Sequence, residues 1–267
     1  RCHTRASCAG PRPQILDSSA SFALLLLAGA SEVYSQNGQD RRNSATVEKI
    51  TNYQPNSNYR DVKLRGYTIR VNKLLMRGHA ELYKQAVDVM DHQLFKIERV
   101  LTAEAIRKLQ KVVIWLEYEE PHHPCAAYHP GRQWLVDNDM NPDKVKCVEI
   151  SNAKNFVDWT ISQPYMVLHE MAHAYHDQFL PKGFENAGVL KAFQTAIKAG
   201  QYQKVLRWNG REVKHYSTTN QMEYFAEATE AYFGTNDYYP FIRPELELFD
   251  PGGARAVEAA WGLLKEK

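Results

Sequence analysis

The hydrophobic pattern of this chain changes its period along the sequence, and that change limits the folds that the chain can adopt. Residues 67–71 alternate between apolar and polar side chains, and residues 111–118 and 145–150 are rich in β-branched residues, which is typical of β-strands. Residues 79–101 instead place apolar side chains at helical spacing, and helical patterns dominate from Gln163 onward. This order predicts an α+β fold, with a small mixed sheet followed by a helical C-terminal half.

The segments between these elements carry weaker signals. Thr102 stands where it can cap the start of a short helix. Asn220 and Glu223 have the spacing of a capping box, which predicts the start of another helix. Residues 119–142 contain Pro, Gly, Asn and Asp and predict a long loop, in which residues 133–136 are a candidate for one more strand.

Composition excludes several classes of protein. The chain has 267 residues, of which 44% are hydrophobic and 24% charged, enough for one sizeable core and unlike a disordered, collagen-like or coiled-coil sequence. The net charge is +2, from 33 Lys and Arg against 31 Asp and Glu. Such a balance creates no strong field toward nucleic acid or a membrane surface, so neither is expected as a partner. A monomer is the default expectation.

The first part of the chain resembles a targeting segment rather than a domain. Residues 1–30 combine a basic start with a short apolar run, and the run ends in Ala28-Gly29-Ala30. This pattern predicts a signal peptide or leader, and hence a secreted protein; the alternatives are a cloned leader or a buried helix. Residues 31–65 are polar and predict a flexible lead-in, so that the folded domain would span residues 66–267.

Two cysteines remain once such a leader is removed. Cys125 and Cys147 would most simply form one disulfide in an exported protein. The alternative is a pair of unpaired, buried thiols.

The strongest chemical signal is the segment His169-Glu170-x-x-His173, which lies in an apolar helical context. Residues four apart share one face of a helix, so both imidazoles can bind one metal ion. Glu170 lies slightly aside, where it can contact a metal-bound water. The alternative is two ordinary histidines on a buried helix face.

A catalytic zinc site needs a third protein ligand and keeps one position open for water. In the metzincin class of zinc peptidases, a glycine and a third histidine follow the motif at positions that correspond to 176 and 179. This chain has His176 and Phe179 there, so that class is excluded. Asp237, in a Gly-Thr-Asn-Asp turn, is a weak candidate. The remaining candidates are glutamates spaced on one helix face, namely Glu223, Glu227 and Glu230. Apolar neighbours surround them, so burial would require a cation or hydrogen-bond donors as partners, although a solvated acidic stripe is the alternative.

Two segments together resemble a known family. His169-Glu-x-x-His173, followed by Tyr216 and then by Glu223-Tyr-Phe-Ala-Glu227-Ala, is similar to the catalytic domain of anthrax lethal factor and its relatives, which are glutamate-zincin metallopeptidases. The resemblance covers residues 163–235. It implies a zincin-like domain with one Zn²⁺ per chain, Glu223 as the third zinc ligand and Tyr216 facing the metal across the cleft. The kinase-cleaving specificity of lethal factor does not carry over, because its other domains have no counterpart here.

The roles that follow agree with ordinary metallopeptidase chemistry. His169, His173 and Glu223 would hold zinc, Glu170 would act as general base, and Tyr216 would stabilise the oxyanion. His215 is an alternative oxyanion donor, although adjacent residues in an extended loop point in opposite directions.

Outside the metal ligands, one further role can be assigned. Glu227 is the best candidate to orient a ligand imidazole from behind, and Asp177 is a weaker one.

Three functions remain open on the sequence. The first is a secreted zinc metallopeptidase that hydrolyses peptide bonds in a peptide or protein substrate. The second is a zinc hydrolase of small or cell-wall peptides. The third is a secreted binding or effector protein whose zinc is structural, in which case a fourth ligand such as His215 or His176 would close the site.

Overall fold

A computed structural model describes residues 53–264. The predicted leader, residues 1–30, and residues 31–52 of the predicted lead-in lie outside the described residues. The rest of the lead-in is not unstructured, because β1 (Tyr59–Leu64) belongs to the sheet and pairs with β2 (Tyr67–Asn72) along its whole length. The domain therefore begins earlier than residue 66. No helix within residues 53–264 combines the length and the hydrophobicity that crossing a membrane would require.

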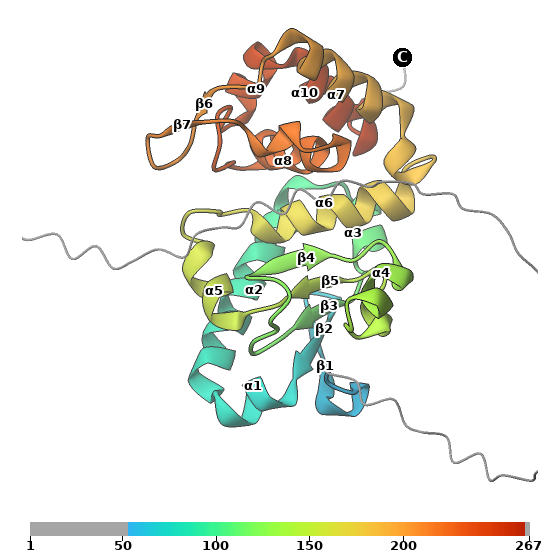
Figure 1. The fold of residues 1–267 in the computed structure, drawn as a ribbon, viewed down its shortest axis with the longest axis vertical. Helices are drawn as coiled ribbons and strands as arrows, with labels where there is room; N and C mark the ends of the chain where they lie inside the picture. The colour runs from blue at the N-terminus through green and yellow to red at the C-terminus, as the bar shows by residue number, and fades with distance from the viewer. Residues whose placement is uncertain (1–52, 265–267) are drawn as a thin grey trace, which may run out of the picture. The chain divides into compact units, whose positions relative to one another are not determined.

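The described residues form an α+β fold built around a five-stranded mixed sheet (Figure 1). The strand order is β1-β2-β3-β5-β4; β1 and β4 run antiparallel to their neighbours, and the central strands are parallel. The three later strands are short: β3 (Ile114–Leu116), β4 (Ala126–Tyr128) and β5 (Val148–Ile150). Strands thus lie in the first part of the chain, as the sequence predicts.

One face of the sheet carries the main core. The alternating residues Ile114 and Leu116 of β3 are fully buried in the same cluster as Met90 and Leu94 of α2 (Ala80–Val100) and Leu168 of α6 (Met166–Phe179). Figure 1 shows α2 and α6 beside the sheet, with α6 next to the edge strand β4. Burial of this face fixes α6 against the sheet.

The opposite face of the sheet buries charges instead. The ammonium of Lys144 is 1% exposed and pairs with Glu149 of β5 and, at 2.9 Å, with Glu117. The Tyr59 hydroxyl and the Asn72 amide also donate hydrogen bonds to Glu117. The charges on this face are therefore paired and hydrogen-bonded, which makes their burial tolerable.

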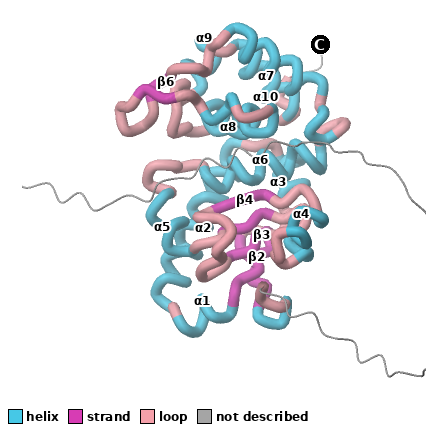
Figure 2. Tube along the Cα trace, viewed as in Figure 1, coloured by secondary structure: helices cyan, strands magenta, loops and turns pink. Residues whose placement is uncertain are grey.

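The C-terminal half is helical, as Figure 2 shows. It contains α7 (Ala187–Ala199), α8 (Gln221–Phe233), α9 (Arg243–Phe249) and α10 (Pro251–Ala260). A two-stranded hairpin, β6 (Val205–Leu206) and β7 (Glu212–Val213), precedes α8. The remaining helices belong to the first half: α1 (Lys73–Gly78), α3 (Ala103–Leu109), α4 (Arg132–Asp137) and α5 (Ala153–Trp159).

The segment 119–142 differs from its prediction. It contains β4 as well as α4, and α4 covers residues 133–136, which were the candidate strand. Side-chain contacts at i, i+4 spacing favour the helix: Gln133 donates to Asp137, and the Asn138 amide caps the Trp134 carbonyl. An apolar run of this length does not distinguish a strand from a helix.

The predicted disulfide is also wrong, because Cys125 and Cys147 are both free thiols. They lie at opposite ends of the β4–β5 ladder: Ser151 donates its amide to the Cys125 carbonyl, and His129 donates to the Cys147 carbonyl. Four residues of strand, or about 13 Å, separate positions 147 and 151. A disulfide requires Cα atoms within about 7 Å, so the register of the sheet keeps these cysteines apart.

Candidate metal centre

Helix α6 presents the three residues of the His169-Glu170-x-x-His173 segment. Most of α6 is buried, and Glu170 and His173 are each 8% exposed. The apolar residues around them pack toward the sheet and α8. The helical spacing places the His169 and His173 rings next to each other, with centroids 4.8 Å apart.

Helix α8 supplies the carboxylates. It begins at Asn220, whose side chain accepts hydrogen bonds from the amides of Met222 and Glu223, as the capping pattern in the sequence indicates. This cap fixes Glu223 in the first turn of α8. The helix is buried along most of its length, including Glu227 and Glu230.

Helices α6 and α8 pack antiparallel, and the contacts between them form a ladder. His173 faces Glu223 near the start of α8, and His169, one turn earlier in α6, faces Glu230 two turns later in α8. Tyr165, one turn before His169, lies against Gly234 at the end of α8. The metal residues are therefore the central part of a helix–helix contact.

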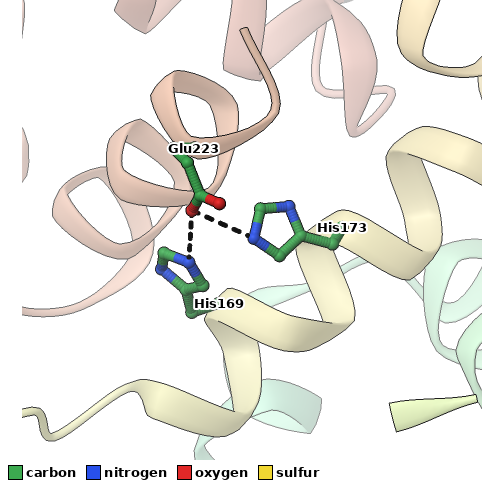
Figure 3. A group of neighbouring side chains, drawn as sticks. All are labelled: His169, His173 and Glu223. Carbon is green, nitrogen blue, oxygen red and sulfur yellow. Dashed lines mark hydrogen bonds and ion pairs between the residues drawn. The ribbon is translucent and has the colours of Figure 1, made fainter. Parts of the chain in front are cut away.

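The histidines and Glu223 converge on one point (Figure 3). The Nε2 atoms of His169 and His173 lie 3.1 and 3.2 Å from the same Glu223 oxygen, Oε2. Bonds of about 2.0–2.1 Å to a tetrahedral zinc would place ligand atoms about 3.3 Å apart. The donor types and their spacing thus fit a zinc ion, with two nitrogens and one carboxylate oxygen as ligands.

The far side of His169 determines which nitrogen faces the metal position. Its Nδ1 lies 2.7 Å from Glu230 Oε1, so Nδ1 carries the proton and Nε2 offers its lone pair to a metal. Burial alone would lower the pKa of His169, but hydrogen bonds to Glu223 and Glu230 raise it well above its usual value in the metal-free protein. A cation at Nε2 would take the place of that second proton.

Glu230 therefore accepts the Nδ1 hydrogen bond of His169. The sequence favoured Glu227 for this role. The nearest Glu227 oxygen is 3.9 Å from Nδ1, and the other oxygen of this buried carboxyl has no hydrogen-bond partner in the described residues. Burial, followed by the charge of Glu230, raises the pKa of Glu227 well above its usual range. The i, i+7 spacing from Glu223 was the signal for Glu230, since it places both on one helix face.

Asp177 does not orient a metal ligand either. Its Oδ2 accepts a hydrogen bond of 2.7 Å from the Tyr128 hydroxyl and pairs with Lys146. It therefore links the C-terminal half of α6 to β4. Asp237, the weak candidate for a third ligand, instead pairs with Arg207 at 3.0 Å.

Tyr216 and His215 have different surroundings. Tyr216 is 47% exposed, and burial together with the charge of Glu223 raises its pKa to about 12, so the phenol keeps its proton at neutral pH. His215 is buried, accepts a hydrogen bond at Nδ1 from the Ser217 amide and packs against Tyr238. Tyr216 is thus available as a donor near the metal residues, whereas His215 has a structural contact.

Glu170 lies within electrostatic range of Tyr216 and His169. Its negative charge contributes to the raised pKa values of both Tyr216 and His169. A carboxylate in this position can act on a water held between the metal ligands and the phenol.

Two cavities lie on either side of α6. A small one, of about 100 Å³, touches the metal residues His173 and Glu223; its other walls are Tyr128, Pro130, Phe184 and Met222. A larger one, of about 560 Å³, lies at the C-terminal end of α6 between Tyr175, Phe179 and Trp261 and contains none of the predicted site residues. The chemistry of the site belongs to the small cavity.

A fourth protein ligand is absent from the cluster that the described residues form around Glu223. His176 is fully buried between Phe184 and Phe225, and burial lowers its pKa to about 4. His215 accepts the hydrogen bond from the Ser217 amide. The described residues therefore offer three possible metal ligands around Glu223, the number of protein ligands that is typical of a hydrolytic zinc site.

Comparison with known proteins adds nothing to this geometry: no family model, no curated protein and no solved structure matches the chain.

Proposed function

We propose that this protein is a zinc-dependent metallopeptidase with a zincin-like domain, in which His169, His173 and Glu223 hold one Zn²⁺. The observation that carries the proposal is the convergence of two imidazole nitrogens on one carboxylate oxygen, at 3.1 and 3.2 Å. The likeness of residues 163–235 to the lethal factor catalytic domain supports the same ligand set. A secreted location remains part of the proposal, because it depends on the leader pattern alone.

Each residue around the metal would have a distinct role. Bound zinc supplies a Lewis acid, which makes a water molecule acidic enough to attack near neutral pH. Glu170 would accept a proton from that water and deliver it to the leaving amine. The Tyr216 hydroxyl would donate a hydrogen bond to the carbonyl oxygen as that oxygen gains negative charge, a contribution of about 3–4 kcal/mol in comparable sites. Glu230 would keep the Nδ1 proton of His169 in place.

The surroundings of the site favour an extended peptide as substrate. Strand β4 pairs with β5 on one side and lies at the edge of the sheet, next to α6. A peptide can add to such an edge as a further strand through main-chain hydrogen bonds. The small cavity beside His173 has walls from Tyr128, the last residue of β4, and from Pro130, so it is placed to receive a side chain of that peptide.

The alternatives make different use of the same site. A structural zinc would need a fourth protein ligand, and His176 and His215 have other contacts. A hydrolase of small or cell-wall peptides would use the same catalytic residues. It would differ from the proposal in the length of substrate that it requires.

The test compares the purified chain with three variants. Zinc is counted by elemental analysis, and cleavage is assayed on a mixed library of peptides of increasing length. We expect one zinc per chain in the wild type and in Glu170→Gln, cleavage in the wild type, and a loss of at least about 10³-fold in Glu170→Gln. Glu223→Gln should lose zinc. Glu81→Gln, a change in an exposed glutamate of α2, should match the wild type.

Each other outcome has a definite meaning. Properly folded protein without zinc would overturn the metal site. Zinc in both the wild type and Glu170→Gln with no cleavage by either would overturn the peptidase and favour a binding protein. Cleavage limited to di- and tripeptides would favour the small-peptide hydrolase.

A further inference from the structure

The start of α6 has an unusual anchor. Its N-cap residue, Tyr165, makes no side-chain capping hydrogen bond. The preceding carbonyl, that of Pro164, instead accepts a hydrogen bond from the ammonium of Lys96 in α2. The same ammonium lies over the Tyr165 ring, 4.1 Å from its centroid. A cation–π contact and a hydrogen bond from one side chain thus fix the first residues of the metal-binding helix.

The Tyr165 ring also meets the end of α8. A Cβ atom at Gly234 would lie 2.2 Å from two carbons of the ring, so the ring occupies the space that any other residue would fill. The φ of Gly234 is −153°, so the ring, and not a left-handed backbone, requires glycine here. This contact determines how closely the two helices approach at this end.

The contact lies one helical turn from the metal ligand His169 on α6 and one turn from its hydrogen-bond partner Glu230 on α8. Tyr165 accepts the α-helical hydrogen bond from the His169 amide, and Gly234 donates its amide to the Glu230 carbonyl. The next contact along the ladder is the hydrogen bond between His169 and Glu230. A shift at Tyr165 and Gly234 would therefore act first on the position of His169 relative to the carboxylates of α8.

We propose that Lys96, Tyr165 and Gly234 form a clamp that positions His169 against Glu230 and Glu223, so that Lys96 and Tyr165 are positioning residues for the metal site. This inference rests on the proposed metal centre and adds a function for residues outside it. Burial lowers the pKa of Lys96 to about 8, while the charge of Glu230 acts in the opposite direction. The cation of the clamp is thus within electrostatic range of the carboxylate that holds His169.

The experiment measures metal binding in the full chain. Zinc affinity is obtained by competition with a chromophoric chelator, and the visible spectrum of the Co²⁺-substituted protein reports the geometry of the ligands. Gly234→Ala places a methyl group in the space that the Tyr165 ring occupies. Lys96→Met removes the cation while retaining an unbranched side chain. Leu135→Ala, in the buried part of α4 and away from the clamp, controls for loss of stability alone.

We expect Gly234→Ala to weaken zinc binding by about tenfold or more and to alter the Co²⁺ spectrum, since misplaced supporting groups cost about 10–100-fold in metal affinity. Lys96→Met should lose about three- to tenfold, and Lys96→Arg should recover part of that loss. Leu135→Ala should retain the wild-type affinity and spectrum at a temperature well below unfolding. If Gly234→Ala does not fold, Lys96→Met alone provides the test.

The clamp would be refuted if Gly234→Ala or Lys96→Met folded and bound both metals as the wild type does. It would also be refuted if Leu135→Ala changed the Co²⁺ spectrum as much as they did, because the effect would then be one of stability. A wild-type protein that takes up neither metal would overturn the metal centre itself, and this result is recognisable before any variant is compared.

Discussion

The exchange of Glu230 for glutamine tests the least expected part of the metal centre. Glu230 Oε1 lies 2.7 Å from His169 Nδ1, and both side chains are largely buried, at 5% and 13% exposed. A hydrogen bond to a charged group in such a place contributes about 1.5–3 kcal/mol. Because each 1.4 kcal/mol is a factor of about ten in affinity, removing the acceptor should weaken zinc binding by about 10–100-fold.

Two variants separate charge from hydrogen bonding. Glu230→Gln keeps an oxygen that can accept the Nδ1 proton, so it should lie near the tenfold end of the range. Glu230→Ala removes the acceptor and should approach about 100-fold. Glu227→Gln is the matched control, because the nearest oxygen of this neighbouring carboxyl of α8 lies 3.9 Å from His169 Nδ1, beyond hydrogen-bond distance. Replacing it should change the affinity by less than about threefold.

The assay is competition for zinc with a chromophoric chelator at neutral pH. Wild-type affinity in both Glu230 variants would show that this carboxylate does not hold His169. A larger loss in Glu227→Gln than in Glu230→Gln would restore the assignment that the sequence favoured.

Three further predictions follow from individual contacts. Burial lowers the pKa of His176 to about 4, so the unfolded chain takes up a proton below about pH 6.5 and the folded protein does not until about pH 4. Stability should therefore fall by about 2 kcal/mol from this group between pH 7 and pH 5, and urea unfolding of metal-free His176→Leu should show a correspondingly smaller decline. Asp177→Asn should lower the free energy of unfolding by about 1–2 kcal/mol, because it weakens the hydrogen bond from Tyr128. Its zinc affinity should stay within about twofold of the wild type; urea unfolding and chelator competition will measure the two quantities. Peptide mapping of unreduced, denatured and alkylated protein should find Cys125 and Cys147 both alkylated; a linked peptide pair would contradict the register of β4 and β5.

The sequence predicts the long, periodic elements of this fold well. Residues 79–101 correspond to α2, and the capping residues Thr102 and Asn220 are found at the starts of α3 and α8. These elements are set by local periodicity and by hydrogen bonds within one helical turn. Short segments were less certain: residues 133–136 of α4 were a candidate strand, because four residues span barely one helical turn and only Leu135 in α4 is buried.

The sequence likewise predicts only part of the candidate site. Two histidines at i, i+4 and the placement of Glu170 follow from the geometry of a single helix. The meeting of His169 with Glu230 rather than with Glu227 depends on the antiparallel register of α6 and α8. That register is a long-range property, fixed by contacts such as the one between Tyr165 and Gly234, and no periodicity within either helix contains it. The predicted disulfide was wrong for a similar reason, since the pairing of β4 with β5 decides which residues face each other.

The acidic face of α8 shows how a protein can bury several carboxyl groups near one metal site. The sequence argument held that Glu223, Glu227 and Glu230 could not all be buried without a cation or hydrogen-bond donors. The three carboxyl groups differ in the partners that the structure gives them. His173 and His169 outweigh the cost of burial at Glu223 and hold its pKa well below the usual range, and His169 donates to Glu230. No imidazole nitrogen lies within hydrogen-bond distance of Glu227. Burial and the charge of Glu230 outweigh its hydrogen bond from Asn236, so the pKa of Glu227 is raised well above the usual range. The carboxyl one turn from the metal ligand Glu223 therefore favours its neutral form, and the one two turns away holds His169, because the partner helix and not the spacing on α8 decides which acid meets an imidazole.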